Sequence, residues 1–281
     1  MAAPSDAGGT AVPGREGRLG RAVPGPARAA GAPGGPCTPH GEPVTQPVRP
    51  FTVRTRRMIS AAAGTAAVLL AATTTGCGGE SAAAAQEGSV SAAQLLAKTR
   101  SCDRISQGTY RTDEEKKPSV PVCGTRGAVY FTADMDVDCD GQRTSKCNER
   151  TDPWYQPDTA YHDSADRPLR ADRLPYVVIP GPSRIWDHRR AGVQGGDVVA
   201  VVHGGRVRYA VVGDLGPKEI IGEASHAAAR ALGVDPDPAR GGTDGPVTYV
   251  VFPGSRVSPL ESHAAAVRLG DRLARKFVGA D

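Results

Sequence analysis

Two carboxylic acids nine positions apart are the residues of this chain best suited to acid–base chemistry. Asp214 follows an apolar run in Gly213-Asp214-Leu215-Gly216-Pro217, and Glu223 lies in Gly222-Glu223-Ala224-Ser225. Hydrolysis of a glycosidic bond requires such a pair, one acid to protonate the leaving oxygen and one carboxylate to activate water. The structural alternative is that Asp214 caps a turn and Glu223 lies in the first turn of a helix, where an anion is favoured.

A second group of carboxylates alternates with apolar residues in the segment 133–141, Ala-Asp-Met-Asp-Val-Asp-Cys-Asp-Gly. On an extended chain every second side chain points to the same side, so we expect the acids to share one face. This acidic row consists of Asp134, Asp136, Asp138 and Asp140. Met135, Val137 and Cys139 should point inward.

Three interpretations of the acidic row remain open. Asp136-x-Asp138-x-Asp140-Gly141 matches the beginning of an EF-hand calcium loop, but Cys147 takes the place of its final Glu and no flanking helices are expected. The row is also compatible with a solvated acidic turn without function. The third interpretation is the wall of a groove for a polycationic ligand, which neighbouring carboxylates attract. We assign no metal and no cofactor.

The positive formal charge of +4 resides in the N-terminal part of the chain. Residues 1–76 carry eight Arg and three acids, whereas residues 102–281 carry 24 Lys and Arg against 25 acids. The C-terminal part therefore lacks the basic surface that nucleic-acid binding requires. Its length suits one domain with a real core.

We divide the chain into four segments. Residues 1–52 are rich in Ala, Gly, Pro and Arg and are expected to be disordered or to precede the true start. Residues 53–77 combine Arg56-Arg57, an apolar stretch and small residues, as in a secretory signal peptide. A lipid on Cys77 would tether the protein to a membrane through the linker 78–101. The domain that carries the function spans 102–281.

Four cysteines in that domain predict two disulfides, because an even count is typical of exported proteins. They are Cys102, Cys123, Cys139 and Cys147. Three pairings are open, and proximity favours Cys102–Cys123 with Cys139–Cys147. No Cys-x-x-Cys motif or nearby His pair points to a metal site.

The element pattern predicts a mainly β fold, an antiparallel barrel or sandwich with a few peripheral helices. Strands are expected at 127–133, 175–180, 197–203, 206–213 and 246–252. Gly204-Gly205 predicts a hairpin between the third and fourth of these. Helices are expected at 91–99, 223–232 and 259–278, the last beginning with the capping box Ser258-Pro259-Leu260-Glu261.

Several short motifs, in one order over roughly 120–255, resemble the fungal-type chitosanases of glycoside hydrolase family 75. They are the acidic row, Asp158-Thr159-Ala160-Tyr161, Pro175-Tyr176-Val177-Val178-Ile179-Pro180, the two segments with Asp214 and Glu223, and Val247-Thr248-Tyr249-Val250-Val251-Phe252. The chain departs from the pattern at Ala160-Tyr161, where we expect Ser-Phe. The resemblance implies an endo-acting enzyme that cleaves β-1,4-linked glucosamine polymers with inversion, using Asp214 and Glu223.

We assign Glu223 as the acid and Asp214 as the base, although a helix N-terminus at Glu223 would lower its pKa and favour the reverse. Subsite walls need carboxylates for ammonium groups and aromatic faces for sugar rings. Besides the acidic row, the candidates are Asp158, Trp154, Tyr161 and Trp186. We expect an extracellular monomer that binds chitosan. The alternative is a non-catalytic secreted module that binds carbohydrate or calcium.

Overall fold

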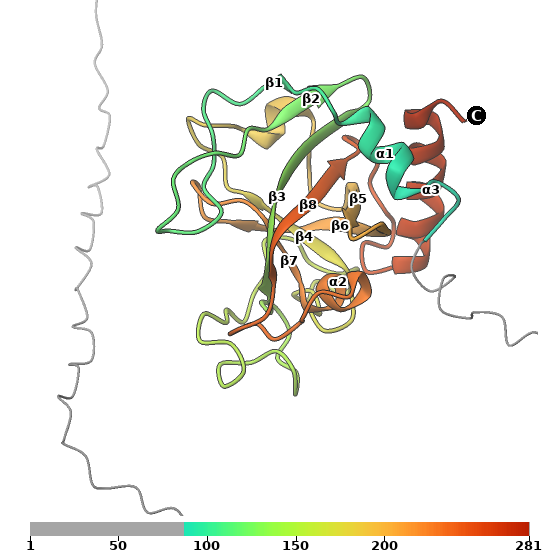
Figure 1. Ribbon diagram of the computed structural model, residues 1–281. Coiled ribbons are helices and arrows are strands. Elements are labelled where there is room, and N and C mark those ends of the chain that lie inside the picture. Colours follow the sequence, from blue (N-terminus) through green and yellow to red (C-terminus); the bar gives the residue numbers. More distant parts are fainter. Residues whose placement is uncertain (1–86, 281) are drawn as a thin grey trace, which may run out of the picture. The chain divides into compact units, whose positions relative to one another are not determined.

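The fold is a closed β-barrel with helices on its outside, seen in the computed structural model, which describes residues 87–280 (Figure 1). Six strands close the barrel in the order β3-β7-β4-β6-β5-β8, because β8 pairs with β3 as well as with β5. The segments 1–52 and 53–77, with Cys77, lie outside the described residues. Among residues 87–280, no helix has the length and apolar character needed to cross a membrane.

The strands are β1 (Asp103–Arg104), β2 (Cys123–Thr125), β3 (Ala128–Asp138), β4 (Tyr176–Pro180), β5 (Val198–His203), β6 (Arg206–Gly216), β7 (Glu223–Ser225) and β8 (Thr243–Val251). The helices are α1 (Ala92–Lys98), the 3-10 helix η2 (His188–Ala191), α2 (His226–Leu232) and α3 (His263–Val278). The expectation of a mainly β fold with a C-terminal helix is confirmed. The barrel is mixed, since β3 runs parallel to β7 and β4 parallel to β6.

Strand alternation gives the barrel two apolar faces. The interior contains β-branched residues and the stacked rings of Phe131 and Tyr249, whose centroids are 4.7 Å apart. A second cluster on the outer face includes Tyr209 and is covered by α3. Residues 87–101, part of the predicted linker, contain α1, which packs against α3 (Figure 1).

The predicted hairpin is confirmed. β5 and β6 pair antiparallel up to His203 and Arg206, and both glycines between them have positive φ, 55° for Gly204 and 78° for Gly205. This backbone conformation is the one that primed two-residue turns require and that glycine adopts without strain.

Two predicted helix starts are wrong. Residues 223–225 pair with β3 and β4 as β7, so α2 begins only at His226, with Ser225 as its N-cap. α3 begins at His263 rather than 259, with Ser262 as its N-cap. The capping box fails because Glu261 accepts hydrogen bonds from the backbone and hydroxyl of Ser164 instead of turning back to its own helix.

Candidate active site

A β-bulge in β6 turns Asp214 to the outside of the barrel. The register with β4 passes from Val177↔Val212 to Val178↔Asp214, so β6 contains one extra residue at this point, Gly213. A Cβ on Gly213 would lie 2.6 Å from Cβ of Tyr176, which only glycine avoids. Bulges of this kind commonly re-aim a side chain near an active site.

Glu223 lies on the same rung of the sheet as Asp214, with one strand between them. Val178 of β4 pairs with Asp214 on one side and with Glu223 on the other. Residues on one rung point to the same face, so both carboxyl groups leave the outer surface of the barrel together. Two interstrand spacings separate their α-carbons by roughly 9.5 Å.

The side chain of Glu223 leans across β4 toward the strand of Asp214. A Cβ built on Gly216, two residues after Asp214, would lie 3.2 Å from Oε2 of Glu223 and 2.9 Å from Cγ1 of Val178. The carboxyl group of Glu223 therefore lies beside Val178 and Gly216, on the side of the strand that carries Asp214.

An acidic groove of about 450 Å³ runs beside Glu223. Its lining consists of Asp113, Asp136, Val137, Asp138, Asp140, Asp152, Trp154, Glu223 and residues 238–241. Arg240 is the cationic side chain of this lining, and it forms an ion pair of 2.9 Å with Asp237. Asp214 is not part of the lining; its side chain is 7 % exposed.

The electrostatic environment distinguishes the two acids. Burial raises the pKa of Glu223 well above its usual value, and the charges of Asp138, Asp136, Asp140 and Asp214 raise it further. Burial also raises the pKa of Asp214, but two backbone N–H groups oppose this effect. Ala160 and Leu215 each donate a hydrogen bond of 2.7 Å to Oδ1 of Asp214. The concern about a helix N-terminus at Glu223 falls away because Glu223 belongs to β7.

Three members of the acidic row, Asp134, Asp136 and Asp138, lie on one face of β3, as expected, and Asp140 follows the end of the strand. Met135 and Val137 point into the barrel as predicted. The same prediction for Cys139 is wrong, because β3 ends at Asp138 and Cys139 is buried in the outer cluster. The pKa values of Asp134 and Asp140 are raised to about 7, and burial is the largest cause. Asp136, Asp138 and Asp140 line the groove, and Asp134 lies farther along the strand, against Gly222. Among residues 87–280, no group of three or more His, Cys, Asp or Glu side chains is arranged to hold a metal ion.

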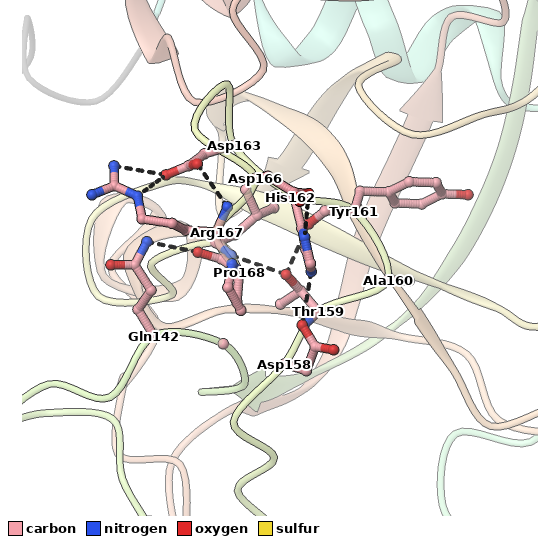
Figure 2. Close-up of polar contacts among 12 residues, drawn as sticks. Gln142, Asp158, Thr159, Ala160, Tyr161, His162, Asp163, Asp166, Arg167 and Pro168 are labelled. Atoms are coloured by element: carbon pink, nitrogen blue, oxygen red, sulfur yellow. Dashed lines mark hydrogen bonds and ion pairs between the residues drawn. The ribbon is translucent and has the colours of Figure 1, made fainter.

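The loop 158–168 covers Asp214 and is braced by its own polar contacts (Figure 2). Thr159 donates to the carbonyl of Tyr161 and accepts from the backbone of Leu169, at 2.8 and 2.9 Å. Figure 2 shows His162 between two carboxylates, with Nε2 2.8 Å from Asp158 and Nδ1 3.1 Å from Asp166. Asp158 is thus engaged within its own loop, on the side of Asp214.

The three aromatic candidates lie in different surroundings. Trp154 is 84 % exposed at the groove. Tyr161 is half-buried, with its ring against Gly195. Trp186 is buried and lines a separate cavity of about 600 Å³ with Arg184 and other residues. The structure therefore brings only Trp154 of the three to the acidic groove.

Three parts of the groove were not predicted from the sequence: Asp113, Asp152 and the loop 238–241. Each comes from a segment without a recognisable motif, and only the barrel topology brings these segments together. Both predicted disulfides are confirmed, Cys102–Cys123 and Cys139–Cys147. The second closes the loop directly after Asp138.

Residues 135–274 match the family described as fungal chitosanase of glycosyl hydrolase group 75. The chain belongs to this family of glycoside hydrolases. Endo-chitosanase B of Aspergillus oryzae is 32% identical over 179 residues, which cover 57% of this chain and 74% of the relative. An endo-chitosanase of the same species is 29% identical over 188 residues, 59% of this chain and 76% of the relative. Endo-chitosanase C is 34% identical over 137 residues, but these cover 47% of this chain and only 33% of that relative.

Proposed function

We propose that this protein is an endo-acting chitosan hydrolase in which Glu223 is the general acid and Asp214 the general base. The observation that carries the proposal is the shared rung: both acids flank Val178 and point to the same side of the barrel, where Glu223 lines a groove rich in carboxylates. The names of the relatives, endo-chitosanases, agree with this choice of substrate.

The charge of the groove favours a cationic polymer. Chitosan carries an ammonium on each deacetylated sugar, and the unpaired carboxylates of the groove attract such groups over a distance. Trp154 offers an aromatic face at the same groove for a sugar ring.

In the proposed reaction Glu223 donates its proton to the leaving glycosidic oxygen, and Asp214 accepts a proton from the attacking water. The raised pKa of Glu223 suits a donor that must be protonated near neutral pH. The two N–H groups on Asp214 favour its ionised form, which a base requires. The α-carbons of the pair lie roughly 9.5 Å apart, two interstrand spacings, and inverting enzymes place their carboxyl groups about 6.5–9.5 Å apart.

We place the mature protein outside the cytoplasm, because two disulfides persist only under oxidising conditions. A monomeric state and a lipid tether at Cys77 remain predictions. Mass spectrometry of the mature N-terminus tests the tether.

The test compares Glu223→Gln and Asp214→Asn with the parent chain on soluble chitosan, by release of reducing ends. Both variants should lose roughly 10²–10⁴-fold in kcat. Glu223→Gln should retain activity on a glucosaminide with a good leaving group, because that substrate needs no acid. Asp214→Asn should recover activity with azide, which replaces the activated water.

Full parental activity in either variant would contradict the assignment. Chitosan binding by the parent chain without any release of reducing ends would favour the non-catalytic module instead. Loss of parental activity on adding a chelator would reveal a calcium-dependent groove.

A further inference from the structure

Asp138 is the last residue of β3 and one of two buried carboxylates in the groove lining, with Asp152. Its side chain is 4 % exposed. Oδ1 accepts a hydrogen bond of 2.6 Å from the backbone of Asp140. Oδ2 has no hydrogen-bond partner of good geometry among the described residues. Burial and the charges of Asp140 and Asp214 raise the pKa of Asp138. The Tyr176 hydroxyl of β4, which donates to the carbonyl of Asp140, faces Asp138 and lowers that pKa.

Nothing cationic compensates this buried carboxylate within the described part of the chain. No ion pair reaches Asp138, and Arg240 of the groove lining is engaged by Asp237. A buried carboxylate without a counter-ion is costly in its charged form, so the site favours a bound proton.

Glu223, the proposed general acid, lies close to Asp138 and needs a bound proton for the reaction. β3 and β7 are parallel neighbours, with Asp136 opposite Glu223 and Asp138 opposite Ser225. Asp138 and Glu223 therefore point to the same outer face. They lie on neighbouring strands, offset by two residues along the strand, so that their α-carbons are about 8 Å apart. Of the charges around Glu223, that of Asp138 raises its pKa most.

We propose that Asp138 is a positioning residue for the acid: Asp138 and Glu223 repel each other across the shared face without a direct hydrogen bond, and so act as one carboxyl pair that holds a proton on Glu223 when substrate binds. This inference rests on the proposed role of Glu223. When Glu223 gives its proton to the leaving oxygen, both members of the pair are charged, and repulsion between them draws a proton back from solvent. The proton that Asp214 took from the attacking water returns to solvent, so the cycle is balanced.

The decisive experiment is a pH titration of carboxyl groups in the substrate-free protein, followed by infrared difference spectroscopy. It compares the parent chain with Asp138→Asn and Glu223→Gln. Asp138→Asn retains the oxygen that accepts from Asp140 and removes only the charge. In either variant the carboxyl transition at highest pH should move down by about one pH unit or more, because one member of a like-charged pair has been removed.

Kinetics on chitosan provide a second readout. In Asp138→Asn the alkaline limb of the kcat/KM profile should move to lower pH by about one unit. Asp152→Asn is the matched control: it removes the other buried carboxylate of the groove, which accepts from Trp154, and should leave the position of the alkaline limb unchanged.

An unmoved highest transition in folded Asp138→Asn would overturn the pair. So would a rise in KM with an unchanged pH profile, which would make Asp138 a substrate ligand only. If Asp138→Asn does not fold, the titration of Glu223→Gln decides. An unmoved carboxyl transition at highest pH in that variant also contradicts the pair. Failure of the proposed function is a separate result, because the parent chain would then release no reducing ends while the titration still reports on the pair.

Discussion

The backbone N–H of Ala160 donates a hydrogen bond of 2.7 Å to Oδ1 of Asp214, across 54 positions of the chain. The loop 158–168 thus contributes directly to the state of the proposed base. A hydrogen bond to a carboxylate favours its ionised form. The contacts that brace this loop consequently affect the pH dependence of the reaction (Figure 2).

Thr159→Val tests this dependence. It removes the hydroxyl that bonds to Tyr161 and Leu169 and leaves the side-chain shape nearly unchanged. We expect kcat/KM to fall roughly tenfold, since hydrogen bonds to charged groups contribute about 1.5–3 kcal/mol. The acidic limb of the profile should move to higher pH because the pKa of Asp214 rises. Ser164→Ala, in the same loop but bonded to Glu261, should leave that limb in place.

Gly213→Ala should disrupt the bulge that aims Asp214. The new methyl group would lie 2.6 Å from Cβ of Tyr176, so one of the two strands must move. Overpacking of this kind costs about 1–3 kcal/mol of unfolding free energy. We expect kcat to fall at least about tenfold, because small displacements of catalytic groups are costly. Gly108→Ala, with open space around the added atom, is the control and should retain both stability and activity.

Trp154→Ala should weaken substrate binding without affecting the fold. Trp154 is 84 % exposed, and the free energy of unfolding should change by no more than about 0.5 kcal/mol. The KM for chitosan should rise several-fold. The chain has two tryptophans, and Trp186 is buried away from the groove. A fluorescence change on binding chitosan oligomers should therefore disappear in Trp154→Ala, and its persistence would place the ligand elsewhere.

The two disulfides should differ in their functional effect. Replacing Cys139 and Cys147 by Ala removes a disulfide whose cysteines are 8 positions apart, which should lower the free energy of unfolding by about 2.5 kcal/mol. It also removes the covalent constraint on the chain next to Asp138. We expect lower stability together with a higher KM. Replacing Cys102 and Cys123, separated by 21 positions, should cost about 3 kcal/mol while leaving KM unchanged. Equal KM values in the two double variants would contradict a role for the shorter loop in the groove.

The acidic row should make the protein less stable as pH rises. The pKa values of Asp134 and Asp140 are about 7 in the folded state, above the value of 3.8 expected for an unfolded chain. The folded protein therefore binds more protons between these values, and stability falls as pH rises from about 4 to 7. Thermal melting of Asp134→Asn should show a flatter decline over this range. A parallel pH dependence in both proteins would refute the shift.

Much of the barrel was predictable because its strands show strong apolar runs with turn glycines, as in the 197–213 hairpin. The start of α3 was not predictable, because Ser258 and Ser262 are both plausible N-caps. Only the tertiary contact between Glu261 and Ser164 decides between them. Glu223 has a sequence context that suits a helix, yet pairing with two neighbouring strands holds it in β7. The shared face of the acidic row follows from strand alternation. The bulge at Gly213 and the contribution of Asp113 and Asp152 depend on long-range packing, for which single-sequence patterns carry no signal.

The position of β4 between the two acids also limits how the chemistry could change. A retaining glycosidase forms a covalent sugar intermediate and needs its carboxyl groups only about 5–5.5 Å apart. Substitutions at position 214 would still leave a whole strand between the acids. A carboxylate at position 178 of the intervening strand would lie closer to each acid, where the Val178 side chain now stands. On the proposed mechanism, the intervening strand keeps the backbones of the two acids roughly 9.5 Å apart, a spacing that favours inversion at the anomeric carbon.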